Sequence, residues 1–251
     1  MLRAFLIALL LATPAAAQNL VLGLSESEVA ITTTFDGSDI LVFGAIKHES
    51  AVTQEAKLDL IVTVKGPDQA TTVYRKDRRF GIWVNAATVE VDAAPSFYAI
   101  ETTRPIADIL GDEADRYYEI TLPRVIKPSA EGHGNNDVAL FTEALMRIRQ
   151  DANKYQLREW DAALIDNTLF RTDVELPANL VEGAYEVSVF LLKDKKVIST
   201  YSTVLDVRKA GLERWMYNLS RQQPFYYGIL SLIIAISAGW GASAIFRVFQ
   251  R

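Results

Sequence analysis

The chain has 251 residues, a formal net charge of -5 at pH 7 and no cysteine. That length allows one large domain or two small ones, and the lack of cysteine excludes disulfides, thiolate metal sites and a cysteine nucleophile. The mild negative charge argues against a general nucleic-acid binder, which would carry a basic face. Hydrophobic residues make up 50% of the chain, and much of the excess lies at its two ends, which indicates a membrane-targeted protein.

Residues 1–17 contain the three parts of a secretory signal peptide. Arg3 supplies the positive charge, residues 4–12 form the apolar core, and Ala15-Ala16-Ala17 ends the segment, so we expect cleavage after Ala17. The apolar core is too short to cross a bilayer, which takes roughly 20 residues. The alternative is an uncleaved N-terminal anchor.

Residues 18–103 alternate between β-branched, apolar segments and turn residues, which predicts a first β-sandwich unit. The segments 29–35 and 39–46 flank Asp36-Gly37, a tight-turn dipeptide, and are therefore predicted to pair as a hairpin. Further strands are expected at 58–64, 71–74, 82–84 and 97–101.

A cluster of four cations lies between the strands expected at 71–74 and 82–84, and it consists of Arg75, Lys76, Arg78 and Arg79. Cations this close to one another repel unless they are solvated or paired. One interpretation is a charged turn between two strands. The other is a surface for an anion or an acidic partner, because arginine side chains suit oxyanions and carboxylates.

Residues 104–165 change character and predict a connector of helices and loops. A short helix is expected at 105–110. Residues 138–155 place their apolar side chains on one helical face, which indicates an amphipathic helix laid on a core. Between these two segments, residues 127–137 contain Pro, Gly and Asn and predict a loop.

Residues 166–210 predict a second β unit, in which Leu180, Gly183 and Tyr185 precede an alternating strand. This spacing resembles the tyrosine corner of Greek-key sandwiches, where the tyrosine hydroxyl bonds to nearby backbone. The alternative is a plain hairpin with an ordinary tyrosine. The fold class expected is mainly β, with two immunoglobulin-like Greek-key units, a helical insertion and one C-terminal transmembrane helix. Whether the two β units form one body or two stays open.

The C-terminal end predicts a membrane anchor in three parts. Residues 211–224 have an apolar stripe typical of an amphipathic helix on a membrane surface, although this helix could instead pack on the folded domain. Residues 225–246 carry no charge and reach about 33 Å as a helix, enough to cross hydrocarbon. Residues 247–251 are the expected cytoplasmic tail, because the signal peptide sends the bulk of the chain outward.

Small side chains recur at every fourth position of the expected span, at Ser231, Ala235, Gly239 and Ser243. Such a row lets a second helix approach closely and predicts a helix-packing face. The alternative is the ordinary composition of membrane helices, in which glycine and serine are common.

The search for catalytic, metal-ligating or cofactor-binding patterns leaves no candidate. His48 lacks a second histidine or a carboxylate at helical spacing, and His133 lies between two glycines in an expected loop, so neither is expected to bind a metal. Asp112, Glu113 and Asp115 lack the oxygen spacing and turn glycine of a calcium loop. The chain contains neither a phosphate loop nor a dinucleotide fingerprint. We therefore expect no catalytic residue, no metal and no cofactor.

Several motifs together resemble the alphaproteobacterial putative transmembrane family, a group with no established activity. The motifs that carry the likeness span most of the mature chain and lie at residues 29–32, 35–37, 76–85, 94–98, 169–171, 176–179, 183–185 and 239–240. The resemblance implies an inner-membrane protein with a periplasmic domain and implies no reaction.

The sequence thus predicts a non-enzymatic, single-pass protein of a bacterial inner membrane with most of its chain in the periplasm. The first hypothesis for its function is an accessory or interaction subunit of a transport-type membrane complex. Its partners would be the membrane and another integral membrane protein or a second copy of the chain, with no nucleic acid. The alternative is a periplasmic sensor that binds a small anion through residues 75–79.

Overall fold

The computed structural model describes residues 20–47, 57–129, 135–210 and 212–249. Within its helices, the side chains of residues 135–137, 212–214, 217–218 and 243–249 are not described. The predicted signal peptide, His48, His133 and the end of the predicted tail therefore lie outside the described residues. The chain divides into two compact units, one made of Met1–Val29 with Asp36–Val207 and the other of Ala30–Phe35 with Arg208–Arg251.

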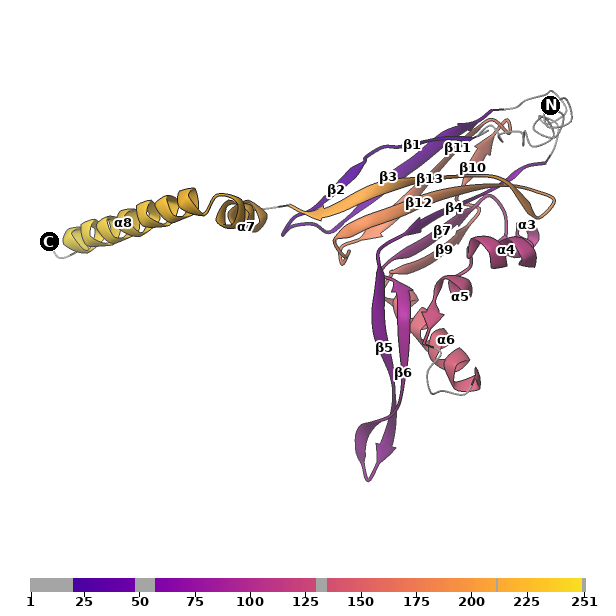
Figure 1. Ribbon diagram of the computed structural model, residues 1–251, viewed down its shortest axis with the longest axis horizontal. Helices are drawn as coiled ribbons and strands as arrows, with labels where there is room; N and C mark the ends of the chain where they lie inside the picture. The colour runs from indigo at the N-terminus through magenta and orange to yellow at the C-terminus, as the bar shows by residue number, and fades with distance from the viewer. Residues whose placement is uncertain (1–19, 48–56, 130–134, 211, 250–251) are drawn as a thin grey trace, which may run out of the picture. The chain divides into compact units, whose positions relative to one another are not determined.

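The described strands form three sheets (Figure 1). The four-stranded sheet has the order β1 (Leu20–Leu24), β3 (Gly37–Ile46), β11 (Leu169–Pro177) and β10 (Ala163–Ile165). The six-stranded sheet has the order β2 (Glu28–Ile31), β13 (Lys196–Lys209), β12 (Gly183–Lys193), β4 (Asp59–Lys65), β7 (Tyr98–Thr102) and β9 (Tyr155–Glu159). The three-stranded sheet has the order β5 (Asp68–Arg79), β6 (Ile82–Pro95) and β8 (Lys127–Pro128).

Strands of both predicted β units are neighbours in the two larger sheets. β3 pairs with β11 in antiparallel register, and β4 pairs with β12 in the same way. The mainly β fold class is confirmed, and the pairings place both segments in shared sheets rather than in sheets of their own. The immunoglobulin-like Greek-key assignment stays a prediction.

The hairpin predicted from residues 29–35 and 39–46 is wrong. β2 lies next to β13 in the six-stranded sheet, whereas β3 pairs with β1 and β11 in the four-stranded sheet. The turn in this segment lies before the Asp36-Gly37 dipeptide, where the Phe35 N–H donates to the Thr32 carbonyl at 3.1 Å, and Gly37, with a φ of 123° that L-residues rarely adopt, is already the first residue of β3. A turn signal marks a bend nearby in the chain, but it does not identify the strand that pairs beyond the bend.

The core is centred on β4 and β7, whose residues are buried on both faces of the six-stranded sheet. Four helices contribute to the apolar cluster on one of these faces, and they are α3 (Ile106–Ile109), α4 (Asp112–Tyr118), α5 (Leu122–Val125) and α6 (Asn135–Asp151). This cluster joins Ile61 and Ile100 of the sheet to Ile109, Val125 and Phe141 of the helices. Residues facing the other way, such as Val62 and Val189, are also fully buried.

β5 and β6 form a long two-stranded ribbon whose two ends differ. The end near Val73, Val89 and Val91 is buried in the core cluster. Beyond Val73, every residue of β5 is exposed, and Figure 1 shows this part of the ribbon projecting away from the sheets. The residues at the projecting end, 74–85, are called the ribbon tip below.

The second unit contains two helices, α7 (Leu212–Gln222) and α8 (Pro224–Phe249). Residues Pro224–Ala242 of α8 are long and apolar enough to cross a membrane, and this is the single such segment in the described part of the chain. The predicted single span is therefore supported. That α7 lies on the membrane surface stays a prediction.

Candidate functional site

The four predicted cations lie within a strand, so the interpretation of residues 75–79 as a turn is wrong. Arg78 pairs with Trp83 and Arg79 with Ile82, which leaves Phe80 and Gly81 as the two residues of the turn. Their φ angles of 51° and 87° are both positive, as in the two-residue turns that fit the twist of β-hairpins. The charged residues thus belong to β5, because each of them has a paired residue on β6.

Phe80 occupies a backbone conformation that its side chain disfavours. Positive φ at the first turn position is usual for Asn, Asp or Gly, and is an outlier for a bulky residue. Such strain persists only where the surroundings enforce it, and it concentrates at functional sites. The turn therefore carries an aromatic residue at a position where local preference favours a small polar one.

The ribbon tip exposes large apolar side chains to solvent. Their relative exposures are 106% for Phe80, 66% for Ile82, 68% for Trp83 and 54% for Tyr74. Single exposed apolar residues are common, but a group gathered at one end of a ribbon is a feature of binding surfaces. These side chains therefore make the tip a candidate contact site.

The ribbon tip is also strongly basic. Asp77 accepts a 2.8 Å hydrogen bond from the Arg78 backbone N–H and lies 3.8 Å from the Arg79 guanidinium. Arg75 and Lys76 form no ion pair with any residue that the structure describes. Four cations and one acid give the tip a formal charge of about +3 by simple counting, whereas the whole chain carries -5.

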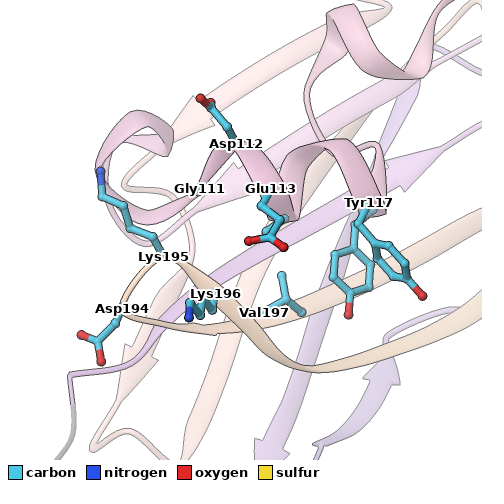
Figure 2. Close-up of a pocket in the computed structure, with 10 residues that line it drawn as sticks. Gly111, Asp112, Glu113, Tyr117, Asp194, Lys195, Lys196 and Val197 are labelled. Atoms are coloured by element: carbon cyan, nitrogen blue, oxygen red, sulfur yellow. The ribbon is translucent and has the colours of Figure 1, made fainter.

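A hollow of about 480 Å³ lies between α4 and the turn that joins β12 to β13 (Figure 2). The backbone N–H of Gly111 donates to the Lys195 carbonyl at 3.1 Å, and Lys195 Nζ donates to the Ala107 carbonyl at 3.1 Å. Figure 2 shows Asp194 turned away from this hollow. These bonds attach the β12–β13 turn to the helical layer, and Gly111 is required because a Cβ there would lie 2.8 Å from the Lys195 carbonyl oxygen.

A second hollow, of about 340 Å³, is lined by hydroxyl groups of the six-stranded sheet, including those of Thr63, Ser188 and Ser202. Ser188 Oγ and Ser202 Oγ lie 2.8 Å apart and share a hydrogen bond. At its inner wall the Tyr98 hydroxyl donates to the Ile120 carbonyl at 2.8 Å, and burial raises the pKa of Tyr98. The hydroxyl groups thus bond to one another and to the backbone, which gives this hollow a structural role.

Glu101 on β7 is a buried ionisable residue that sequence patterns did not single out. It is fully buried, and neither carboxyl oxygen has a hydrogen-bond partner in the structure. Desolvation raises the pKa of Glu101 to about 8, while the nearby Arg158 acts in the opposite direction. Burial therefore favours the neutral, protonated form of this side chain, which costs less to bury than the charged form.

Asp115, part of the acidic group at residues 112–115, has a structural role. Its carboxylate accepts hydrogen bonds from the Thr121 N–H at 2.8 Å and the Thr121 hydroxyl at 2.7 Å. Arg124 lies 3.7 Å from the same carboxylate. Among the described residues, no three His, Cys, Asp or Glu side chains are grouped so that they could hold a metal ion.

The predicted tyrosine contact lies at the start of β12. The Tyr185 hydroxyl donates to the Val181 carbonyl at 2.9 Å and accepts from the Val181 N–H at 3.2 Å. A bond from a tyrosine hydroxyl to backbone a few residues upstream is the contact that characterises a tyrosine corner. Gly183 has a φ of 155° and a built Cβ would lie 2.9 Å from Pro67, so its place in the motif has a steric reason.

Helix α8 carries the predicted row of small residues, of which Ser231, Ala235 and Gly239 are exposed. The side chain of Ser243 lies outside the described residues. Ser231 Oγ donates to the Tyr227 carbonyl at 2.9 Å within the helix, so its hydroxyl is satisfied without a partner. A Cβ added at Gly239 would meet no atom within 4 Å, so this chain does not fill the space beside it.

A family model described as "putative transmembrane protein" matches residues 19–248. The chain belongs to this family. The match extends over the β-rich unit and the apolar helix alike, and it confirms the alphaproteobacterial resemblance drawn from the motifs. Searches among curated proteins and among solved structures found no match.

For this member of the putative transmembrane protein family, the predicted site residues fall into three separate places. Arg75, Lys76, Arg78 and Arg79 lie together on the ribbon tip, Leu180, Gly183 and Tyr185 lie at the start of β12, and Ser231, Ala235 and Gly239 lie on α8. The exposed apolar members of the tip, Tyr74 and Ile82, were missed. Their signal was the run of apolar residues that directly follows Phe80-Gly81, with the cations on the other side of that dipeptide.

Proposed function

We propose that this family member is a non-enzymatic accessory subunit of a transport-type membrane complex. The β-rich unit would be exported across a bacterial inner membrane, and α8 would hold the chain in that membrane with its C-terminus in the cytoplasm. The family match and the single candidate span support anchorage in a membrane. The export and its direction rest on the predicted signal peptide at residues 1–17.

The observation that carries the proposal is the row of small residues on α8. In lipid there is no hydrophobic force between helices, so association depends on close packing, which small side chains permit. Ser231, Ala235 and Gly239 are exposed, and the space beside Gly239 is open. A helix of another integral membrane protein, or of a second copy, is the occupant that fits this row.

Two glycines of α8 offer a matched test, because a Cβ at either Gly239 or Gly241 would meet no atom of this chain within 4 Å. They project about 200° apart on the helix, so only Gly239 lies in the row. Gly239→Leu is expected to reduce the partner protein recovered from native membranes by about tenfold. Gly241→Leu, the control, is expected to leave recovery unchanged.

Recovery is measured by gentle crosslinking in native membranes, detergent extraction and mass spectrometry of the purified full chain. Equal recovery with Gly239→Leu and with the unaltered chain would contradict the proposal. The proposal would also be contradicted if the unaltered chain were recovered only as a monomer, with no integral membrane protein crosslinked to it.

The second candidate function is a sensor for a small anion, favoured by the charge of the ribbon tip. Its weakness is that Arg75, Lys76, Arg78 and Arg79 are all exposed on a two-stranded ribbon, where water competes with a small ion. If the sensor function is right, sulfate or phosphate at millimolar concentration raises the melting temperature of the full chain. The double change of Arg78→Gln and Arg79→Gln then abolishes that rise, and the absence of any rise would exclude this candidate.

A further inference from the structure

The ribbon tip combines two properties that are usually separate. Its turn and the adjoining β6 residues are apolar and exposed, as Phe80, Ile82 and Trp83 show. Its cations follow behind the turn on β5, ending about 16 Å from the apex at Arg75 if strand spacing is regular. Phe80 lies beyond all four cations, and Arg75 and Lys76 are set back from it, which matches the depth order of a membrane surface, where hydrocarbon lies beneath phosphate groups. Arg78 and Arg79 start level with Trp83 and Ile82, but arginine side chains are long enough to reach back to the phosphate level.

Cross-strand register distributes both kinds of side chain over both faces of the ribbon. Arg78 stands opposite Trp83, and Arg79 stands opposite Ile82, so each face has one cation beside one apolar residue. A flat protein partner would contact one face of the ribbon. A tip that is alike on both faces suits an occupant that surrounds it, as lipid does.

The charge of the tip is opposite to that of the rest of the chain. A tip of about +3 on a chain of net charge -5 would be attracted to anionic lipid while the remainder is repelled. Each Lys or Arg near an anionic surface strengthens binding by about fivefold. The charge therefore favours contact by the tip over contact by other parts of the described unit.

Helix α8 adds a second reason to favour lipid. When one span holds the chain in a bilayer, that bilayer is always close to the rest of the chain, at a high effective concentration. A second contact with the same bilayer can then form even if its own affinity for lipid is weak. The strained φ of 51° at Phe80 is then explained, because an aromatic residue at the apex is the part that reaches deepest.

We propose that the ribbon tip is a membrane-contact element that inserts Phe80, Ile82 and Trp83 into the anionic surface of the bilayer that α8 spans. Its basic residues bind lipid phosphates, and its apolar residues enter the boundary with the acyl chains. This inference rests on the anchoring part of the proposed function and is independent of the accessory role.

The chain contains no cysteine, so one introduced cysteine can be labelled cleanly. Ile82→Cys places an environment-sensitive fluorophore on the ribbon tip, and Ile198→Cys places it on β13, where the native residue is 50% exposed. The full chain is placed in nanodiscs of phosphatidylcholine with or without phosphatidylglycerol. Quenching by nitroxide-labelled lipid then reports contact with the bilayer.

We expect at least about threefold stronger quenching at position 82 than at position 198 in anionic discs, and a smaller ratio in neutral discs. Raising the salt to about 0.5 M reduces the ratio, because charges are then screened within a few Å. The double change of Arg78→Gln and Arg79→Gln reduces it in the same way. Phe80→Asn, which suits the turn better and keeps the fold, reduces quenching at position 82.

Equal quenching at the two positions in anionic discs would overturn the inference. The inference would also be overturned if the fluorophore at position 82 were protected only in native membranes, by a protein that crosslinks to it. The same holds if quenching at position 82 appeared only after anionic vesicles were added to the discs, because the tip would then bind a separate bilayer. Carbonate extraction of the unaltered chain tests anchorage separately. Gly239→Leu, which tests the accessory role, is expected to leave quenching at position 82 unchanged.

Discussion

Strands β4 and β7 differ from the outer part of β5 and β6 in what stabilises them. Residues of β4 and β7 are buried on both faces, and burial of apolar surface holds these strands in the sheet. The ribbon tip buries almost nothing and depends on cross-strand pairing and a two-residue turn. Substitutions in β4 and β7 should therefore lower the free energy of unfolding strongly. Substitutions in the ribbon tip should change it little and should affect binding instead.

The largest effect is expected from a cavity in the central sheet. Leu60 on β4 is fully buried, so Leu60→Ala removes buried methyl groups and leaves a void. We expect a loss of about 3 kcal/mol in the free energy of unfolding. Urea denaturation of the full chain in neutral detergent, followed by circular dichroism, measures it.

The matched change at the ribbon tip is Ile82→Ala, which should alter the free energy of unfolding by less than about 0.5 kcal/mol. If the two variants were destabilised equally, the contrast between the regions would be refuted.

The next effect depends on pH and comes from Glu101. Its unfolded carboxyl releases a proton near pH 4.5 and its folded carboxyl near pH 8, so this group lowers the stability as pH rises from 4.5 to 8. Glu101→Gln keeps a neutral side chain of similar shape. The variant is expected to match the unaltered chain near pH 4.5 and to exceed its stability by on the order of 2 kcal/mol at pH 6, with a larger difference at higher pH.

The measurement is the difference in free energy of unfolding between the two proteins at several pH values. Asp173→Asn, at an exposed acid on β11, serves as the control and should show no such rise. A pH-independent difference for Glu101→Gln would show that Glu101 is ionised in the folded protein.

A smaller effect is expected at the start of β12. Tyr185→Phe removes the hydroxyl that bonds to both backbone groups of Val181 but keeps the ring beside Phe97. We expect a loss of about 1 kcal/mol, the usual contribution of such a hydrogen bond. A variant as stable as the unaltered chain would show that these bonds do not contribute to the fold.

The smallest effect has the opposite sign. Phe80→Asn places a residue that tolerates positive φ at the first turn position, so it should stabilise the chain by about 0.5 kcal/mol in neutral detergent. Gly81→Ala is the contrasting variant and should destabilise the turn, because its φ of 87° disfavours an L side chain. A loss of stability in Phe80→Asn would show that the phenyl ring contributes to the ribbon itself.

Local structure was predictable where one segment contains the whole signal. The apolar helix at the C-terminus was recognised because a long charge-free run suffices to specify it. The spacing of Leu180, Gly183 and Tyr185 predicted a bond from the tyrosine hydroxyl to nearby backbone, and Tyr185 does bond to Val181, while the corner of a Greek-key sandwich stays a prediction. The family resemblance could be drawn from sequence because its motifs are spread over most of the chain, and the family model that matches residues 19–248 confirmed it.

Features that depend on distant residues were not predictable in the same way. The register of β3 with β11 joins Gly37 to Pro177, and nothing local to either strand identifies the other. The burial of Glu101 was missed because one carboxylate in a short strand gives no sign that both faces of that strand are covered. The cations at residues 75–79 were assigned to a turn because charge runs are common there, whereas pairing with residues 82–87 keeps them in a strand.

The pairing of β4 with β12 has a consequence for biosynthesis. During synthesis, the hydrogen-bonding edge of β4 stays open until residues 183–193 have emerged, after the whole helical connector. An apolar strand with an unpaired edge can join the wrong strand or a neighbouring chain. The topology therefore makes an early apolar strand wait for a late partner, and the interval before residues 183–193 emerge is when mispairing is most favoured.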